Sequence, residues 1–184
     1  INVKTGGSTS EKWQTYDGLL DMKSDISAIT ISWNKFQNHD KTMLIGSSDS
    51  DGSNSSRTIS LHHNYFFNCG QRLPMVRNSQ IHIFNNVYEA SNAFYSNSYC
   101  VGVRKNALII AENNAFGSGI GYSFKDSDGT VYVSGNSDSS SKKMNTKTTN
   151  SKPFNVPYKY TLDSADGAKN SVKGDAGAGK SFSK

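Results

Sequence analysis

His82-Ile83-Phe84-Asn85-Asn86, followed two positions later by Tyr88, is the stretch that decides the fold. Four other short β-like segments also end on Asn, at residues 30–34, 60–64, 110–114 and 132–136. In all but the last of the five, an aromatic residue follows the Asn by two positions: Phe36, Phe66, Tyr88 and Phe116. The Asn-to-Asn intervals are 30, 22, 28 and 22 residues. A fixed local motif at variable spacing is typical of a solenoid with loops inserted between its coils.

The chemistry of the motif indicates which solenoid this is. Asn tolerates the left-handed backbone region at a turn between strands. Asn side chains stacked on successive coils can hydrogen-bond as a ladder. The aromatic residue two positions on would stack in the core, where no coil buries its apolar face alone. The sequence therefore predicts an all-β parallel β-helix; the alternative is an antiparallel sandwich with Asn in its turns, although Asn-Gly hairpin signals are absent.

The composition suits many short strands and turns. Only 34% of the residues are hydrophobic, while the 11% that are aromatic argue against disorder for most of the chain. The formal charge of +5 and the pI near 9.1 fit an anionic partner: a nucleic acid, an acidic polysaccharide or an anionic membrane. Charge alone fits a basic surface without a partner equally well. No apolar run approaches the length of a membrane span.

The length of the chain predicts a single domain over residues 1–184. Within it, residues 1–15 form a polar entry segment that we expect to be exposed. Residues 137–152 have a low-complexity composition that predicts a flexible loop. Residues 153–184 read as a C-terminal cap or tail.

Two smaller features concern a helix and the cysteines. Ser164 is placed to cap a short helix over about 165–172, with Gly174 ending it, and this helix would cover the open end of a solenoid. Cys69 and Cys100 could form one disulfide or remain two buried thiols.

Two clusters near the N-terminus contain charged residues that could carry chemistry. On a strand, Asp17, Leu19 and Asp21 would share a face. Two carboxylates this close repel unless a cation lies between them, and such hard oxygen ligands suit Ca²⁺, although surface Asp pairs are also common. Lys41 precedes an apolar strand that Gly46 ends with a tight turn. A lone Lys of this kind is more often solvated than functional.

The segment from Gln71 to Arg77 presents two guanidinium groups. Pro74 fixes its own φ and holds Leu73 extended, so Arg72 and Arg77 stand five residues apart on a rigid segment. Paired Arg residues match carboxylates in geometry and can bind them bidentately. The alternative is a pair of surface salt bridges.

Together, these clusters make the chain identifiable: the stretch from Tyr16 to Phe116 resembles the pectate lyases of polysaccharide lyase family 1. The segments that carry the resemblance follow in the family's order, at residues 17–21, 29–34, 39–46, 62–64, 72–77, 82–86 and 112–114. The tail after Tyr158 also looks like that family's C-terminal cap. The resemblance implies a right-handed parallel β-helix.

The resemblance also implies an activity: β-elimination of α-1,4-linked polygalacturonate, assisted by Ca²⁺, in a secreted, extracellular protein. A free guanidinium is protonated near neutrality, so an Arg base implies an alkaline pH optimum. By motif position, the implied roles are base for Arg72, substrate binding for Lys41, Arg77 and Lys23, and Ca²⁺ ligation for Asp17 and Asp21.

Two other functions stay open: a pectin lyase-like enzyme acting on esterified substrate, and a truncated, non-catalytic β-helix that binds acidic glycans. Nucleic-acid binding rests on charge alone. Members of the family usually carry further coils and Ca²⁺-binding Asp residues before the motif at 17–21. Either that part lies outside this chain, or the chain is a truncated member of the family. In the second case we expect a weak Ca²⁺ site, and a first coil whose open edge is covered by a partner segment or by self-association.

Overall fold

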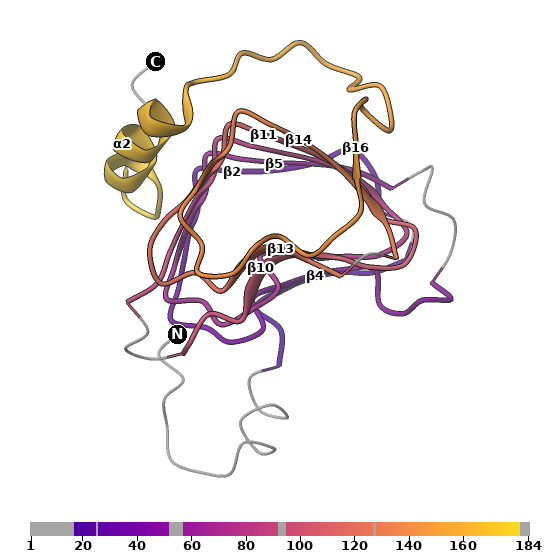
Figure 1. The fold of residues 1–184 in the computed structure, drawn as a ribbon, viewed down its shortest axis with the longest axis horizontal. Helices are drawn as coiled ribbons and strands as arrows, with labels where there is room; N and C mark the ends of the chain where they lie inside the picture. The colour runs from indigo at the N-terminus through magenta and orange to yellow at the C-terminus, as the bar shows by residue number, and fades with distance from the viewer. Residues whose placement is uncertain (1–16, 25, 52–56, 92–94, 127, 181–184) are drawn as a thin grey trace.

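The computed structural model describes residues 17–24, 26–51, 57–91, 95–126 and 128–180. Their strands form three parallel sheets, and together the sheets make a right-handed parallel β-helix. Viewed as in Figure 1, the successive coils superimpose as a triangle with one sheet on each side. The fold class predicted from the Asn motifs is thus confirmed.

Each sheet takes one strand from each coil. Sheet A contains β1 (Leu20–Met22), β4 (Met43–Ile45), β7 (Met75–Val76), β10 (Tyr99–Val103) and β13 (Tyr122–Lys125). Sheet B contains β2 (Ile29–Ser32), β5 (Thr58–His62), β8 (Gln80–Phe84), β11 (Leu108–Glu112), β14 (Thr130–Ser134) and β16 (Thr148–Thr149). Sheet C contains β3 (Lys35–Gln37), β6 (Tyr65–Phe67), β9 (Val87–Glu89), β12 (Ala115–Phe116) and β15 (Ser137–Asp138).

The corner between sheets B and C holds the predicted Asn ladder. The main-chain N–H of each ladder Asn donates to the side-chain oxygen of the ladder Asn in the next coil, at 2.8 to 3.0 Å. The ladder consists of Asn34, Asn64, Asn86, Asn114 and Asn136. One detail of the prediction is wrong, because the left-handed conformation belongs to the residue before each ladder Asn. Those residues are Trp33, His63, Asn85, Asn113 and Gly135, with φ between 50° and 63°. The turn aims the Asn side chain inward, where its amide can reach backbone groups of neighbouring coils.

The core is built from columns of like residues, because parallel strands in register place equivalent positions beside one another. In sheet B, Ile29, Ile59, Ile81, Ile109 and Val131 pair in sequence along one column. The four aromatic residues of the motif stack face to face as predicted, with ring centroids 4.7 to 5.0 Å apart. Offset stacking of this kind adds to the burial of the rings themselves.

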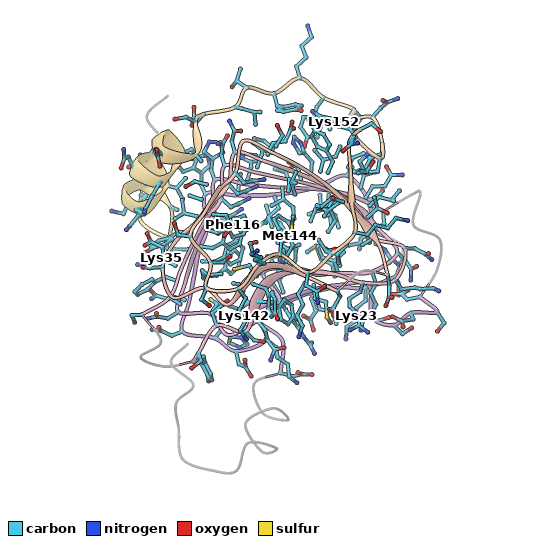
Figure 2. The ribbon with its side chains drawn as sticks, in the orientation of Figure 1. Lys23, Lys35, Phe116, Lys142, Met144 and Lys152 are labelled. Carbon is cyan, nitrogen blue, oxygen red and sulfur yellow. The ribbon has the colours of Figure 1, made fainter. Side chains whose placement is uncertain are left out.

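Residues 137–152 differ from the predicted flexible loop, because they trace a further coil. β15 pairs with β12 of the preceding coil, and β16 pairs with β14. Between them, the main-chain N–H of Lys142 donates to Gly121 and that of Asn145 to Phe124. The side chain of Met144 lines the hollow at this end of the solenoid and lies within the triangle (Figure 2). The polar composition misleads because the last coil exposes most of its side chains and is held by backbone hydrogen bonds.

Residues 150–163, here called the strap, run along the outside of sheet B (Figure 1). The Tyr158 hydroxyl lies 2.9 Å from Nδ1 of the buried His82 and 2.9 Å from the Ser60 hydroxyl. The Tyr160 hydroxyl donates to the Glu112 carboxylate at 2.7 Å. The strap is therefore fastened to sheet B by side chains rather than by strand pairing.

The helix α2 (Ala165–Asp175) begins where the sequence predicts and ends slightly later. The Ser164 hydroxyl accepts from Gly167 N–H at 3.1 Å, as expected of an N-cap. Its location differs from the prediction: α2 packs beside sheet C, with Val172 buried against that sheet, and does not cover an end of the solenoid. The ammonium of Lys173 lies 2.8 Å from the carboxylate of Glu89 in β9. The small apolar stripe of α2 packs instead against Tyr65, Val87 and Ala115 on the outer face of sheet C.

Three further expectations concern the cysteines, the N-terminal end and membranes. Cys69 and Cys100 are both buried and both free. A hollow of about 580 Å³, lined by residues that include Leu20, Ile31 and Phe36, opens at the end of the first described coil. The predicted cover for this end stays a prediction, and the predicted entry segment at 1–15 lies outside the described residues. In the described part of the chain, no helix is long and apolar enough to cross a membrane.

Candidate active site on sheet A

The outer face of sheet A brings the predicted site residues together. Neighbouring parallel strands lie about 4.8 Å apart, so residues at equivalent positions form columns across the coils. The first column comprises Lys41, Arg72, Tyr99, Tyr122 and Lys142. Lys41 pairs with Gln71, the residue before Arg72, and Arg72 lies near Tyr99 of the next coil. Tyr99 pairs with Tyr122, and Tyr122 pairs with Lys142. The middle column comprises Asp21, Leu44, Met75, Gly102 and Lys125. The third column lies one residue past the paired strands and comprises Lys23, Gly46, Arg77 and Arg104.

Arg72 lies near the centre of this face, in the first column. Its backbone is left-handed, with φ of 60°. This conformation is costly for Arg, and backbone hydrogen bonds to the neighbouring coils hold it. Its carbonyl accepts from Met43 N–H at 2.8 Å, and the next N–H, of Leu73, donates to Cys100 at 2.7 Å. The peptide bond that precedes Pro74 is cis. The half-buried guanidinium lies close enough to Tyr99 for its charge to act on that hydroxyl, while its buried Nε has no hydrogen-bond partner among the described residues. The backbone thus aims a polar side chain across the sheet.

Lys41 and Asp17 form an ion pair at the edge of the same face. The ammonium Nζ lies 2.6 Å from Asp17 Oδ1. The hydrogen bond from Lys41 holds the pKa of the Asp17 carboxyl below its usual value, and the charge of Arg72 acts in the same direction. Lys41 stands immediately before β4, as the sequence predicts. Asp17, by contrast, precedes β1 and does not lie on the same strand as Asp21, so their shared strand face was a wrong prediction.

Asp21 nevertheless stays close to the Asp17 segment because of Gly18. A Cβ built on Gly18 would stand 2.4 Å from Asp21 Oδ2, so only glycine leaves room for the carboxylate there. The side chain of Asp21 is exposed on the middle column. The two predicted metal ligands therefore lie beside one backbone turn, at one end of the columns.

Arg77 lies in the third column, over the tight turn that Gly46 makes. Gly46 has φ of +83°, and a Cβ there would stand 2.6 Å from the carbonyl oxygen of Arg77. This confirms the turn predicted at Gly46 and shows that it also makes room for the next coil. The Arg77 side chain is largely buried and its Nε lies 2.8 Å from Asp49 Oδ1. Asp49 belongs to the loop that follows β4, so this loop holds the guanidinium in place.

The donor set fits Ca²⁺ in kind but is incomplete in number. Asp17 and Asp21 offer the hard carboxylate oxygens that Ca²⁺ prefers, and Gly18, which directly follows Asp17, leaves room for the Asp21 carboxylate. Ca²⁺ takes about six to eight oxygen ligands. Across the described ranges of the chain, no group of three or more His, Cys, Asp or Glu side chains could hold a metal ion. The remaining oxygens would have to come from substrate, water or residues outside those ranges.

Sequence reasoning missed several residues of this face, and a signal for them exists. Tyr99, Tyr122, Lys125, Lys142 and Arg104 all belong to the three columns but lie in no motif that the sequence singles out. The signal is their distance from the ladder. Arg72, Tyr99 and Tyr122 stand 14, 15 and 14 residues before Asn86, Asn114 and Asn136, respectively. Counting back from Asn86, Asn114 and Asn136 therefore finds three members of the first column.

Comparisons with known proteins bear on this geometry. The pectate lyase family model matches residues 3–181. A pectate trisaccharide-lyase from Bacillus licheniformis is 41% identical over 168 residues, which is 90% of this chain and 47% of that relative. Pectate lyase D from Dickeya chrysanthemi is 37% identical over 128 residues, covering 63% of this chain and 33% of that relative.

Solved structures give the same result for the fold. A pectate lyase bound to a hexasaccharide superimposes with a TM-score of 0.79 at 28% identity, covering 97% of this chain and 48% of that one. A pectate lyase variant from Xanthomonas campestris gives 0.78 at 30% identity, covering 98% and 58%. The chain spans about half the length of the curated relative from Bacillus licheniformis, and less of the others. Because the family model matches nearly the whole chain, we conclude that it belongs to the pectate lyase family.

Proposed function

We propose that this chain carries the active face of a pectate lyase, which cleaves α-1,4-linked polygalacturonate by β-elimination. The observation that carries the proposal is the position of Arg72 among the cations of sheet A, with the carboxylates of Asp17 and Asp21 at one end of the columns. Substrate carboxylates and Arg or Lys side chains attract one another, so an acidic glycan fits this face. The relatives named as pectate lyases support the same substrate.

In this proposal Arg72 is the base. The neutral guanidine form of its side chain accepts the C5 proton of a galacturonate residue, and the electron pair of the C–H bond forms the C4–C5 double bond. The glycosidic C4–O bond breaks, its electron pair leaves with the oxygen, and that oxygen takes a proton from solvent water. The left-handed backbone, held by hydrogen bonds from Met43 and to Cys100, orients the side chain before substrate arrives. Orientation of this kind contributes to catalysis because less freedom is lost in the transition state.

The other cations bind and orient the substrate. Arg77, held by Asp49, presents a guanidinium to carboxylate oxygens in the third column. Lys41 lies in the first column, at the opposite edge of the face from Arg77. There its ammonium group pairs with Asp17 and can reach a sugar hydroxyl or carboxylate. Lys23 is exposed on the same face, on the lower side of the triangle (Figure 2). Contacts from both the first and the third column fix a sugar chain better than contacts from one column alone.

We assign Ca²⁺ to Asp17 and Asp21, with oxygens of the substrate completing the set. When bound, Ca²⁺ supplies positive charge beside the uronate carboxylate, which makes the neighbouring C5 proton more acidic. The residues of this chain then keep the Asp21 carboxylate close against Gly18 and the Asp17 carboxylate paired with Lys41. Because Lys41 already neutralises Asp17, we expect the ion to bind weakly without substrate. We also propose that the protein acts outside the cell, where its polymeric substrate is found.

The test is release of unsaturated product from polygalacturonate, followed by ultraviolet absorbance with and without added Ca²⁺. We expect activity that requires Ca²⁺, is lost in excess chelator, and is highest at alkaline pH because a guanidinium is protonated near neutrality. Activity that survives the chelator or peaks at acidic pH would count against this mechanism. Faster cleavage of highly esterified pectin would instead identify a pectin lyase-like enzyme. Binding without product would identify a non-catalytic glycan-binding β-helix.

A further inference from the structure

The first and middle columns continue past the proposed catalytic centre and end in two lysines. From Arg72 the first column runs to Tyr99, Tyr122 and Lys142, while the middle column reaches Lys125. Three coil spacings separate the coil of Arg72 from that of Lys142, a distance of roughly 14 Å. This is longer than a single sugar residue. Figure 2 places Lys142 on the same lower side of the triangle as Lys23.

Aromatic rings hold the two ammonium groups above the sheet. Lys125 Nζ lies 5.4 Å from the ring centroid of Tyr99 and 6.0 Å from that of Tyr122. Lys142 Nζ lies 5.0 Å from the Tyr122 ring centroid. At these distances a ring face attracts a cation and restricts where the flexible side chain can go. Tyr122 therefore stands between two positioned cations.

Neither of these lysines forms an ion pair within the described part of the chain. The acid next to Lys125, Asp126, lies instead 3.5 Å from Arg104. Lys142 is exposed, and Lys125 and Tyr122 are partly exposed. The two ammonium groups are thus positioned without being neutralised, which suits an anionic ligand.

Between Arg72 and these lysines, the face is low and apolar. A Cβ built on Gly102 would stand 3.1 Å from both Met75 Cγ and Tyr99 Cε2, so the Tyr99 ring lies across the glycine. Met75 and Tyr99 are buried, and the Tyr99 hydroxyl approaches the Met75 sulfur at 3.6 Å. Gly102 has no side chain that would block a sugar chain running across the sheet from one coil to the next. The apolar C–H groups of a sugar ring can rest on such a floor while its carboxylate turns toward a cation.

We propose that Tyr122, Lys125 and Lys142 form a distal subsite that binds the carboxylate of a uronate residue beyond those held at Arg72. This inference rests on the proposed function, because the same acidic glycan would cross all the coils. The subsite adds affinity for long substrates and takes no part in bond breaking, because it lies coils away from Arg72. The length of substrate that the protein prefers would therefore depend on the coils that carry Tyr122, Lys125 and Lys142.

The experiment uses the 184-residue chain and substrates of defined length, from the shortest oligogalacturonate that is cleaved up to polygalacturonate. In Lys142→Ala, we expect KM for long substrates to rise about two- to fivefold, and roughly tenfold when Lys125→Ala is added, as is usual for exposed ionic contacts. Both kcat and the kinetics on the shortest substrate should not change. Lys142→Arg should keep wild-type KM, because the charge remains.

The matched control is Lys147→Ala, an exposed lysine of the same last coil whose backbone bonds to sheet B instead. It should leave KM unchanged at every length. Equal effects on short and long substrates, or none on either, would overturn the subsite. If the wild-type chain has no lyase activity, the proposed function fails separately. The subsite is then tested by calorimetry: wild type must bind long oligogalacturonates more tightly than short ones, and Lys142→Ala must lose that difference.

Discussion

Arg72 shows how a single side chain is placed by the coils around it. Its left-handed backbone turns the side chain onto the outer face of sheet A, and two backbone hydrogen bonds to neighbouring coils hold that turn. In the next coil Tyr99 lies near enough to feel the charge of the guanidinium. The strained conformation persists because the strands on both sides determine it.

Replacing Arg72 by Lys should abolish turnover while leaving substrate binding partly intact. The ammonium keeps the charge but cannot occupy the guanidinium position, so the proton transfer should slow by about 10²- to 10⁴-fold. The measurement is kcat on polygalacturonate beside affinity for oligogalacturonate. Arg77→Lys serves as a comparison, in which KM should rise more than kcat falls. An Arg72→Lys enzyme of near wild-type kcat would remove Arg72 from the role of base.

Tyr88 presents the opposite case, a polar atom that the fold leaves unpartnered. Its ring is fully buried between Phe66 and Phe116 in the aromatic stack, and its hydroxyl has no hydrogen-bond partner among the described residues. Burial raises the pKa of this hydroxyl well above its usual value. Tyr88→Phe should therefore leave the free energy of unfolding unchanged or raise it by up to about 2 kcal/mol. Urea unfolding measures this, with Tyr65→Phe as control.

The control, Tyr65→Phe, removes a hydroxyl that does form a hydrogen bond, unlike the hydroxyl of Tyr88. The Tyr65 hydroxyl donates to Glu89 at 2.9 Å, so its removal should destabilise by about 1 kcal/mol. A Tyr88→Phe variant that is destabilised as much would show that the Tyr88 hydroxyl has a partner after all.

At the scale of the elements, the Asn ladder joins the strands of successive coils. Asn86 is fully buried, and its side chain accepts from Asn64 N–H at 2.9 Å and donates to the carbonyl of Leu61 at 2.8 Å. It also donates to Asn114 at 3.1 Å. If the amide is removed, the Asn64 N–H and the Leu61 carbonyl lose this partner, whereas Asn114 still accepts from the main-chain N–H of residue 86. The penalty for a buried group left without a partner exceeds the value of the bond.

Asn86→Ala should accordingly lower the free energy of unfolding by about 3–5 kcal/mol. The matched variant is Asn34→Ala, at the exposed end of the ladder, which should cost about 1 kcal/mol because water can reach the groups it leaves. Chemical denaturation of both proteins compares them. Equal losses would mean that the buried position has no special cost.

The strap is the element whose attachment depends on pH. Burial lowers the pKa of His82 to about 4, so the imidazole is neutral in the folded protein and bonds Tyr158 and Glu112. Burial opposes the ionised form of Glu112, but hydrogen bonds from Tyr160 and Lys152 hold its pKa below the usual value. Both groups bind protons more readily in the unfolded chain, so both contributions to stability are lost as pH falls.

For His82, the window follows from its shift. Between about pH 6.5 and pH 4 the unfolded chain takes up a proton that the folded protein refuses, which lowers the free energy of unfolding by up to about 3 kcal/mol. Urea unfolding at several pH values measures the slope. In His82→Gln this part of the slope should disappear, whatever the stability of the variant at pH 7. An unchanged slope would assign the pH dependence to other groups.

At the scale of the whole molecule, the sequence predicts more of the repeat than of its ends. The ladder and the aromatic stack are local patterns that recur, so five copies identify the fold. The position of α2 beside sheet C depends on which outer face is apolar and flat, and Tyr65, Val87 and Ala115, which contact it, come from three separate coils. The coil at 137–152 depends on backbone bonds that its composition does not reveal.

The candidate site divides in the same way. Arg72, Arg77 and Lys41 stand in motifs, so their residue types and spacing indicate their chemistry. Tyr122 and Lys142 become neighbours only through the register of strands 20 positions apart, which no local pattern records. The Gly18 contact with Asp21 is likewise a matter of packing.

The columns of sheet A have a consequence for how such enzymes can diversify. Each coil adds one position to every column, while loops of different length leave the columns in register, as the intervals of 22 to 30 residues show. Preference for a given degree of polymerisation would therefore change in whole steps of about 4.8 Å, by gain or loss of a coil. Loop insertions at the corners would change what flanks the outer face of sheet A, and they would leave the number of positions in each column unaltered.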